Sequence, residues 1–67
     1  MRILIFGSDI LNGIKPTREH EEDILDSITE YEKYCISHPN FKNNKADITI
    51  NFIKKDYENR LLTDNFN

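Results

Sequence analysis

Apolar residues recur at helical spacing in two separate stretches of this sequence, and that pattern constrains the fold more than any other feature. Residues three or four positions apart lie on the same side of an α-helix, because each residue advances the helix by about 100°. The first stretch repeats apolar residues in this way at Ile24, Ile28, Tyr31 and Cys35. The second stretch does so at Ala46, Ile50, Ile53, Tyr57 and Leu61. Two such helices can bury their apolar sides against each other, so we predict a mainly α fold built on an antiparallel helical hairpin.

Both stretches have residues at their ends that fit the starts and stops of helices. We predict a first helix over residues 17–37, with the Thr17 hydroxyl as its cap and Pro39 as its stop. We predict a second helix over residues 44–62, which begins next to asparagines that can cap it. The last residues, 63–67, are expected to fray, because chain ends have few partners.

The N-terminal segment carries signals of extended structure. Residues 2–6 are rich in β-branched and aromatic side chains, which favour strands. The dipeptide Asn12-Gly13 tolerates the positive φ angles of a tight hairpin turn. We therefore expect residues 1–16 to form a short strand or an extended arm.

An alternative interpretation of the sequence is a small α+β fold. Strands near 2–6 and 47–53 would pair in it, because apolar and polar residues alternate from Ile48 to Phe52 as in a half-buried strand. We prefer the helix, because its apolar stripe continues to Leu61, where the alternation has already stopped.

Small size makes the covering of apolar residues a central question. We expect one small domain over residues 1–67, and a core of that size rarely supplies more than about 3–5 kcal/mol without a disulfide, a metal or a partner. In the second predicted helix, Ile48 and Phe52 lie roughly opposite the main apolar stripe. Residues 3–6 could cover them, or another chain could. Ile48 and Phe52 are therefore candidate partner-binding residues, and the partner is either a larger protein or a second copy in a homodimer.

Acidic residues gather in the first predicted helix. Residues 17–34 hold seven acids and two bases, whereas residues 35–62 hold three acids and five bases. A row of carboxylates on a helix can imitate a phosphate backbone and occupy a basic groove, although most such rows are simply solvated. The acids that we select as candidate partner-binding residues are Glu19, Glu22, Asp23, Asp26 and Glu30.

Composition indicates a reducing compartment and gives no sign of a membrane segment. The single cysteine, Cys35, cannot form an intramolecular disulfide, so we expect a cytoplasmic protein. The apolar run at residues 3–6 is too short for a signal peptide or a membrane span. A net charge of -3 gives no general attraction to nucleic acid or to anionic lipid. Ten isoleucines and eight asparagines are typical of an AT-rich genome, such as that of a low-GC bacterium, its phage or a mobile element.

The residues with metal-binding or nucleophilic chemistry are too few to define a site. Cys35 and His38 have the spacing of two metal ligands, but a closed zinc site needs four, and His20 is the only other candidate of that kind. The same pair could act as a nucleophile and its base, yet the apolar stripe would bury the sulfur. Gly7 and Gly13 do not form a phosphate-binding loop. We therefore assign no catalytic residue, no metal ligand and no cofactor.

These observations favour a small protein-binding regulator, inhibitor or adaptor over an enzyme. It would act through an apolar side of a helix or through the acidic helix. One alternative is a small nucleic-acid-binding regulator that uses Lys54, Lys55 and Arg60 of the second helix. A further alternative is a small metal protein or enzyme centred on Cys35 and His38.

Overall fold

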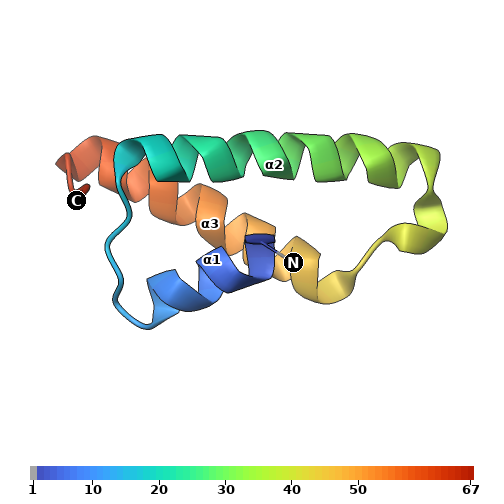
Figure 1. The fold of residues 1–67 in the computed structure, drawn as a ribbon, viewed down its shortest axis with the longest axis horizontal. Helices are drawn as coiled ribbons and strands as arrows, with labels where there is room; N and C mark the ends of the chain where they lie inside the picture. The colour runs from blue at the N-terminus through green and yellow to red at the C-terminus, as the bar shows by residue number, and fades with distance from the viewer. Residues whose placement is uncertain (1) are drawn as a thin grey trace.

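Three α-helices make up most of the chain, which confirms the predicted mainly α fold (Figure 1). The computed structural model describes residues 2–67, so Met1 lies outside the described part. The helices are α1 (Arg2–Leu11), α2 (Arg18–Ser37) and α3 (Asn44–Thr63), with a short 3-10 helix, η1 (Pro39–Phe41), between α2 and α3. No strand occurs among the described residues.

Helix α1 replaces the strand or arm that we predicted within residues 1–16, and that prediction is wrong. Ile3, Phe6 and Ile10 recur at spacings of three and four, and all three are buried on one side of α1. A preference for strands in so short a segment is weak, and burial against neighbouring helices overrides it.

The alternative α+β fold is also wrong, because residues 2–6 lie in α1 and residues 47–53 lie in α3. In a helix, residues two positions apart point to nearly opposite sides, whereas residues four apart share one side. Ile50 is therefore buried in the core, while Ile48 and Phe52 lie together on another side of α3. The alternation in the sequence reflects two sides of a helix and not two sides of a strand.

The dipeptide Asn12-Gly13 ends α1 and does not form a hairpin turn. Gly13 adopts a φ of 84°, which only glycine reaches without strain. Its N–H donates to the carbonyl of Ile10 at 3.0 Å, and the N–H of Ile14 donates to the carbonyl of Asp9 at 3.0 Å. This pair of bonds is the Schellman motif, which satisfies the last carbonyls of a helix.

Side-chain caps fix the starts of both long helices. Thr17 caps α2, since its Oγ1 accepts from the backbone N–H of His20 at 3.1 Å. Asn43 caps α3, since its Oδ1 accepts from the N–H of Lys45 at 2.8 Å. The N–H of Asn43 also donates to the hydroxyl of Tyr31 at 3.0 Å, which ties the start of α3 to the side of α2.

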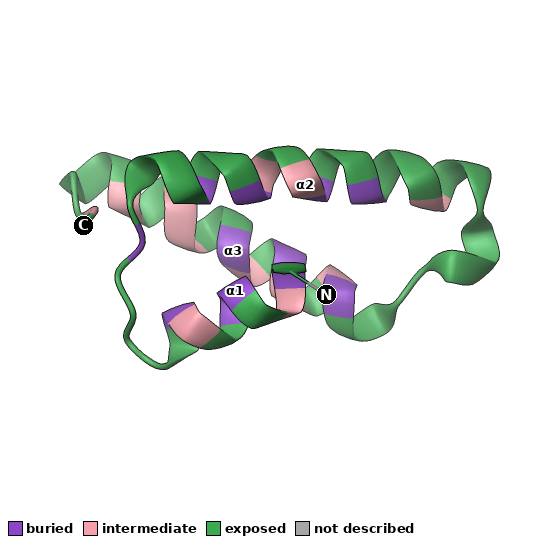
Figure 2. Ribbon diagram, in the orientation of Figure 1, coloured by how far each residue is buried: buried purple, intermediate pink, exposed green. Residues whose placement is uncertain are grey.

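All three helices share the core. Figure 1 shows α2 along the top of the molecule, α3 running back beneath it and α1 below, and Figure 2 shows the buried residues on the sides where the helices meet. Helix α1 packs mainly on α3. The predicted hairpin of two helices is therefore incomplete, because a third helix supplies a large share of the core. The buried hydrophobic residues are Ile3, Phe6, Ile10, Ile24, Ile28, Tyr31, Ala46, Ile50 and Ile53.

Helices α1 and α3 approach each other closely at Gly7. A methyl group built on the Cα of Gly7 would overlap the Cγ2 methyl of Thr49 and lie 3.9 Å from Cδ1 of Ile53. The absence of a side chain at this position therefore sets how near the two helices lie.

Residues 64–67, part of the segment expected to fray, turn back against the body of the protein, and we call them the C-terminal strap. Asp64 adopts a left-handed conformation with φ of 51°, which reverses the chain after α3. The N–H of Asn65 donates to the carbonyl of Arg60 at 3.1 Å, and the N–H of Asn67 donates to the carbonyl of Pro16 at 2.8 Å.

Candidate functional site

An apolar groove lies between α1 and α3, and we call it the α1–α3 groove. Its volume is about 400 Å³. Helix α1 and helix α3 both line it, through Leu4, Gly7, Ser8, Leu11, Ile48, Thr49 and Phe52. The groove exists because Gly7 lets the helices touch at one point, while the larger side chains around it form the walls.

Both apolar residues that we selected from the sequence, Ile48 and Phe52, lie in this groove. Ile48 remains 71% exposed, whereas Phe52 is half-buried and packs against the core. On the opposite wall, Leu11 is 74% exposed. The N-terminal helix thus covers Phe52 only in part, and the groove leaves a set of apolar side chains in contact with solvent.

Two lysines flank the apolar stripe on α3. Lys45, Ile48, Phe52 and Lys55 follow one another at spacings of three, four and three, which places them along one side of the helix. Both lysines are exposed, and neither forms an ion pair within residues 2–67. Lys45 and Lys55 therefore stand on the same side of α3 as Ile48 and Phe52, although neither is among the lining residues of the groove.

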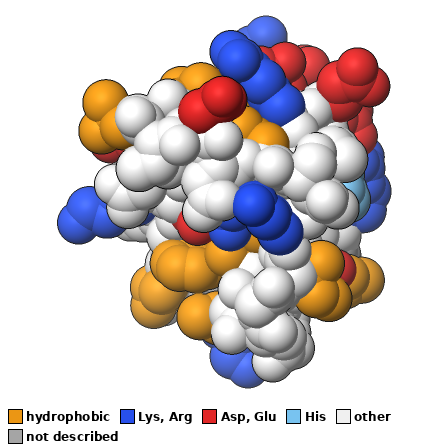
Figure 3. Space-filling view, turned by 90° about the vertical axis from the view of Figure 1, so that its left-hand side faces the viewer, with side chains coloured by type: hydrophobic (Ala, Val, Ile, Leu, Met, Phe, Trp, Pro, Cys, Tyr) orange, Lys and Arg blue, Asp and Glu red, His pale blue; other side chains and the backbone are white. Residues whose placement is uncertain are grey.

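Exposed hydrophobic side chains also gather at the end of the molecule shown in Figure 3, in its lower half, whereas charged side chains dominate the top. Leu11 and Ile14, near the end of α1, are 74% and 55% exposed. Exposed hydrophobic residues also occur on the other two helices, among them Ile36 of α2 and Ile48 and Leu62 of α3.

The five acids that we selected from the sequence share one exposed side of α2. They fall within an arc of about 100°, opposite the buried residues of the helix. Their positions are Glu19, Glu22, Asp23, Asp26 and Glu30. These five acids therefore form an acidic stripe on the surface of α2, and some of them bind other residues of the same chain.

Two acids of this stripe bind neighbouring groups of the same chain. Asp23 accepts from Arg2 at 2.6 Å. Glu22 accepts from the hydroxyl of Tyr57 at 3.0 Å and from Arg18 at 3.2 Å. Both hydrogen bonds lower the pKa of Glu22, and the bond from Tyr57 has the larger effect. A partner would therefore meet a stripe whose charge is already partly balanced.

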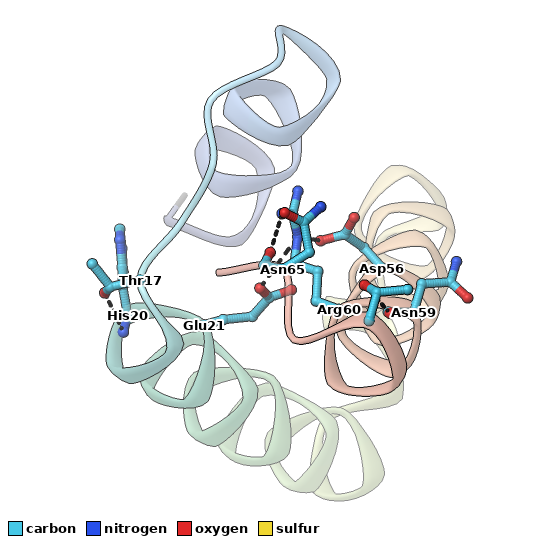
Figure 4. A network of polar contacts seen from close by, with 8 residues as sticks. Thr17, His20, Glu21, Asp56, Asn59, Arg60 and Asn65 are labelled. Atoms are coloured by element: carbon cyan, nitrogen blue, oxygen red, sulfur yellow. Dashed lines mark hydrogen bonds and ion pairs between the residues drawn. The ribbon is translucent and has the colours of Figure 1, made fainter. Parts of the chain in front are cut away.

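A buried acid, Glu21, is a feature that sequence reasoning missed. Its side chain is 0% exposed, and its Oε2 lies 3.8 Å from Nε of Arg60 (Figure 4). Arg60 in turn donates from Nε to Oδ2 of Asp56 at 2.8 Å. Burial, followed by the nearby Asp56 carboxylate, raises the pKa of Glu21 to about 7, and the positive charge of Arg60 opposes this shift. Glu21 stands three residues before Ile24, so the helical spacing of the apolar stripe could have revealed its buried position.

The three residues considered for metal binding, His20, Cys35 and His38, are not all brought together. His20 and Cys35 lie on the same straight helix, and 15 residues of helix separate them by roughly 22 Å. The ring of His38 stacks on Tyr34 with centroids 4.0 Å apart. Cys35 is half-buried. Residues 2–67 contain no cluster of three or more such side chains that could hold a metal ion.

The basic residues of α3 do not form one continuous surface. Lys54 binds Glu32 of α2 at 3.1 Å. The side chain of Arg60 is only 14% exposed and is engaged by Asp56. Lys55 lies instead beside the α1–α3 groove. The three basic residues considered for contacts with phosphates therefore lie in three different environments.

Comparisons with protein-family models, curated proteins and solved structures give no match for this chain. In the described part of the chain, no helix is long and apolar enough to cross a membrane.

Proposed function

We propose that this chain is a small protein-binding regulator, inhibitor or adaptor whose α1–α3 groove receives the apolar side of a partner helix. The observation that carries this proposal is the groove itself, where Ile48 and Leu11 remain largely exposed beside the half-buried Phe52. Exposed apolar residues that gather in a concave surface are typical of interaction sites. Burial of a side chain such as Ile48 or Phe52 contributes about 1.5–3 kcal/mol to binding.

The partner that best fits the groove is an amphipathic helix with acidic residues beside its apolar stripe. A helix in a groove presents anchors at positions i, i+3 or i+4, and i+7. Lys45 and Lys55 stand at the two ends of the apolar stripe of α3, where acidic residues of a partner would pair with them. Such pairs at the rim contribute mainly to orientation and to the rate of association.

A second copy of this chain fits the groove less well. In a symmetric dimer, the same surface of both copies meets across a two-fold axis. Lys45 and Lys55 of one copy would then approach the same lysines of the other, and like charges repel. We therefore favour a partner of different sequence over the homodimer, and we place the interaction in the cytoplasm, which the single unbridged Cys35 supports.

Designed peptides provide a direct test on the whole protein. One peptide is an amphipathic helix with leucines at i, i+3, i+4 and i+7 and flanking glutamates, and the other has the same apolar residues with flanking lysines. We expect the acidic peptide to shift the backbone amide resonances of α1 and α3 in NMR spectra, with weaker binding at high salt. Ile48→Ser should weaken this binding at least about fivefold, because one anchor contact is lost.

Ile36→Ser is the matched control, because Ile36 is 81% exposed on α2, away from the groove. Binding that is equally sensitive to both substitutions, or a lysine peptide that binds as well as the acidic one, would contradict the proposal. Sedimentation equilibrium over a wide concentration range separates the homodimer from a monomer. Self-association that Ile48→Ser abolishes would favour the second copy as occupant.

A further inference from the structure

Glu21 is a buried acid whose side chain accepts no hydrogen bond from any described residue. Neither of its side-chain oxygens has a hydrogen-bond partner among residues 2–67, although the residue is fully buried. The nearest positive charge, on Nε of Arg60, lies 3.8 Å from Oε2, which is too long for a hydrogen bond. An ionised carboxylate in such a position is costly, whereas a protonated one is neutral and can donate its proton.

Arg60 already binds two other groups, which hold its guanidinium away from Glu21. Its Nε donates to Oδ2 of Asp56 at 2.8 Å, and its Nη1 donates to the carbonyl of Asn65 at 2.8 Å. The side chains of Arg60 and Asp56 are only 14% and 17% exposed. One positive charge thus faces two acids, and the cluster is neutral only when one acid carries a proton.

The carbonyl that Arg60 binds belongs to the C-terminal strap, which connects this cluster to the surface. Figure 4 shows Glu21, Asp56 and Asn65 converging on the Arg60 side chain. Beyond Asn65, the ring of Phe66 packs against Tyr57, with centroids 6.0 Å apart. The strap is also held by the backbone hydrogen bonds of Asn65 and Asn67 described above, and the guanidinium of Arg18 lies over the ring of Phe66 at 5.9 Å.

We propose that Glu21, Asp56 and Arg60 form a proton-operated latch that holds the C-terminal strap closed while Glu21 is protonated and releases it when Glu21 ionises. An ionised Glu21 attracts the Arg60 guanidinium, which needs to move less than 1 Å to form a hydrogen bond of normal length. That movement weakens the bond to the carbonyl of Asn65. The raised pKa of Glu21, about 7, places the change near neutral pH, with the strap closed below it and open above it.

Two other charged groups near the start of α2, Arg18 and Asp23, form ion pairs outside this cluster. Arg18 binds Glu22 on the same helix. On α1, Arg2 pairs with Asp23, and Asp9 lines a separate cavity beside His20. The ring of His20 packs edge-on against Phe6 of α1 at 5.1 Å. From α3, Asp56 and Arg60 are the charged groups that act on Glu21, and the strap adds only the Asn65 carbonyl.

NMR spectroscopy of the whole protein tests the latch directly. The side-chain carboxyl resonance of Glu21 should titrate near pH 7, and the amide of Asn67 should lose protection from hydrogen exchange over the same range. With a pKa of 7, the protonated fraction falls from about 90% at pH 6 to about 10% at pH 8. The protection factor of the Asn67 amide, corrected for the intrinsic rate, should therefore fall about tenfold.

Three variants separate the latch from other effects of pH. Glu21→Gln keeps the shape without the charge and should hold the strap closed at every pH, whereas Glu19→Gln, an exposed acid in the same turn, should behave like the parent. His20→Gln should also leave the transition in place, because the ring of His20 packs against Phe6 and takes no part in the latch. Asp56→Asn removes the competing acid and should move the transition to lower pH, which tests the latch even if Glu21→Gln fails to fold. A Glu21 resonance that titrates near pH 4.5, or strap protection that is constant from pH 6 to pH 8, would overturn the proposal.

Discussion

Gly7→Ala should destabilise the protein, although alanine is the better helix former. In an exposed helix, this substitution would add about 1 kcal/mol of stability. At the contact of α1 with α3, however, the new methyl group would overlap Cγ2 of Thr49. Overpacking of this kind costs about 1–3 kcal/mol, so after the helix-propensity gain is subtracted we expect a net loss of up to about 2 kcal/mol. For a domain of this size, a loss of about 2 kcal/mol lowers the melting temperature by roughly 8–15 °C.

A double-mutant cycle identifies the cause. Thr49→Ser removes the methyl group that the new side chain would meet, and alone it should cost about 1 kcal/mol or less. In the double variant, the alanine has room, so the loss caused by Gly7→Ala should largely disappear. Urea unfolding followed by circular dichroism should give a coupling energy of at least about 1 kcal/mol.

Gly13→Ala and the Thr49→Ser background test whether the close contact is the cause. Gly13→Ala should also destabilise, but by a different cause, since Gly13 has a φ of 84° and open space around its Cα. Its effect should therefore be independent of Thr49→Ser. If Gly7→Ala raises stability, or if its effect is unchanged in the Thr49→Ser background, the close contact between α1 and α3 does not limit the size of this residue.

Further predictions concern the core, the caps and pH. Ile53→Asp should abolish cooperative melting, because it buries an unpaired charge among all three helices. Asn43→Ala should cost about 1 kcal/mol or more in urea unfolding, because the cap of α3 loses its acceptor. The free energy of unfolding should fall as pH rises from about 4.5 to about 7, because Glu21 binds its proton more tightly in the folded chain than in the unfolded one. Glu21→Gln should remove this pH dependence, whose total size we place at about 1–3 kcal/mol, because a pKa difference of one between the folded and unfolded chains corresponds to about 1.4 kcal/mol.

The two long helices could be predicted because each has an apolar stripe long enough to show its period. Helix α1 could not, because residues 2–6 satisfy the patterns of a strand and of a helix equally well. Contacts with α2 and α3 favour the helix, and its main contact, with α3, joins distant parts of the chain. The failure to predict α1 also limited the prediction of the groove. Ile48 and Phe52 stood out as apolar residues outside the main stripe, whereas Leu4 and Leu11 acquire a common side only in a helical α1.

Glu21 escaped prediction for a different reason. An acid in the first turn of a helix is normally explained by its interaction with the helix dipole, and that explanation is sufficient for exposed residues. Its burial depends on the end of α3, where Arg60 and Asp56 close over it. The spacing of Glu21 from Ile24 places it on the buried side of α2, but the sequence of one helix does not show that Arg60 and Asp56 of another helix are its neighbours.

The pairing of α1 with α3 has a consequence for the order in which the chain folds during synthesis. Gly7 and Thr49, which meet in the structure, lie 42 positions apart in the sequence, and the ribosome makes α1 first and α3 last among the helices. Closing a loop of that length costs about 3 kcal/mol of chain entropy, so α1 gains its main partner only after α3 has been made. Until then Ile3 and Phe6 have no α3 to cover them. The nascent chain therefore leaves part of the apolar side of α1 exposed while α2 and α3 are being synthesised.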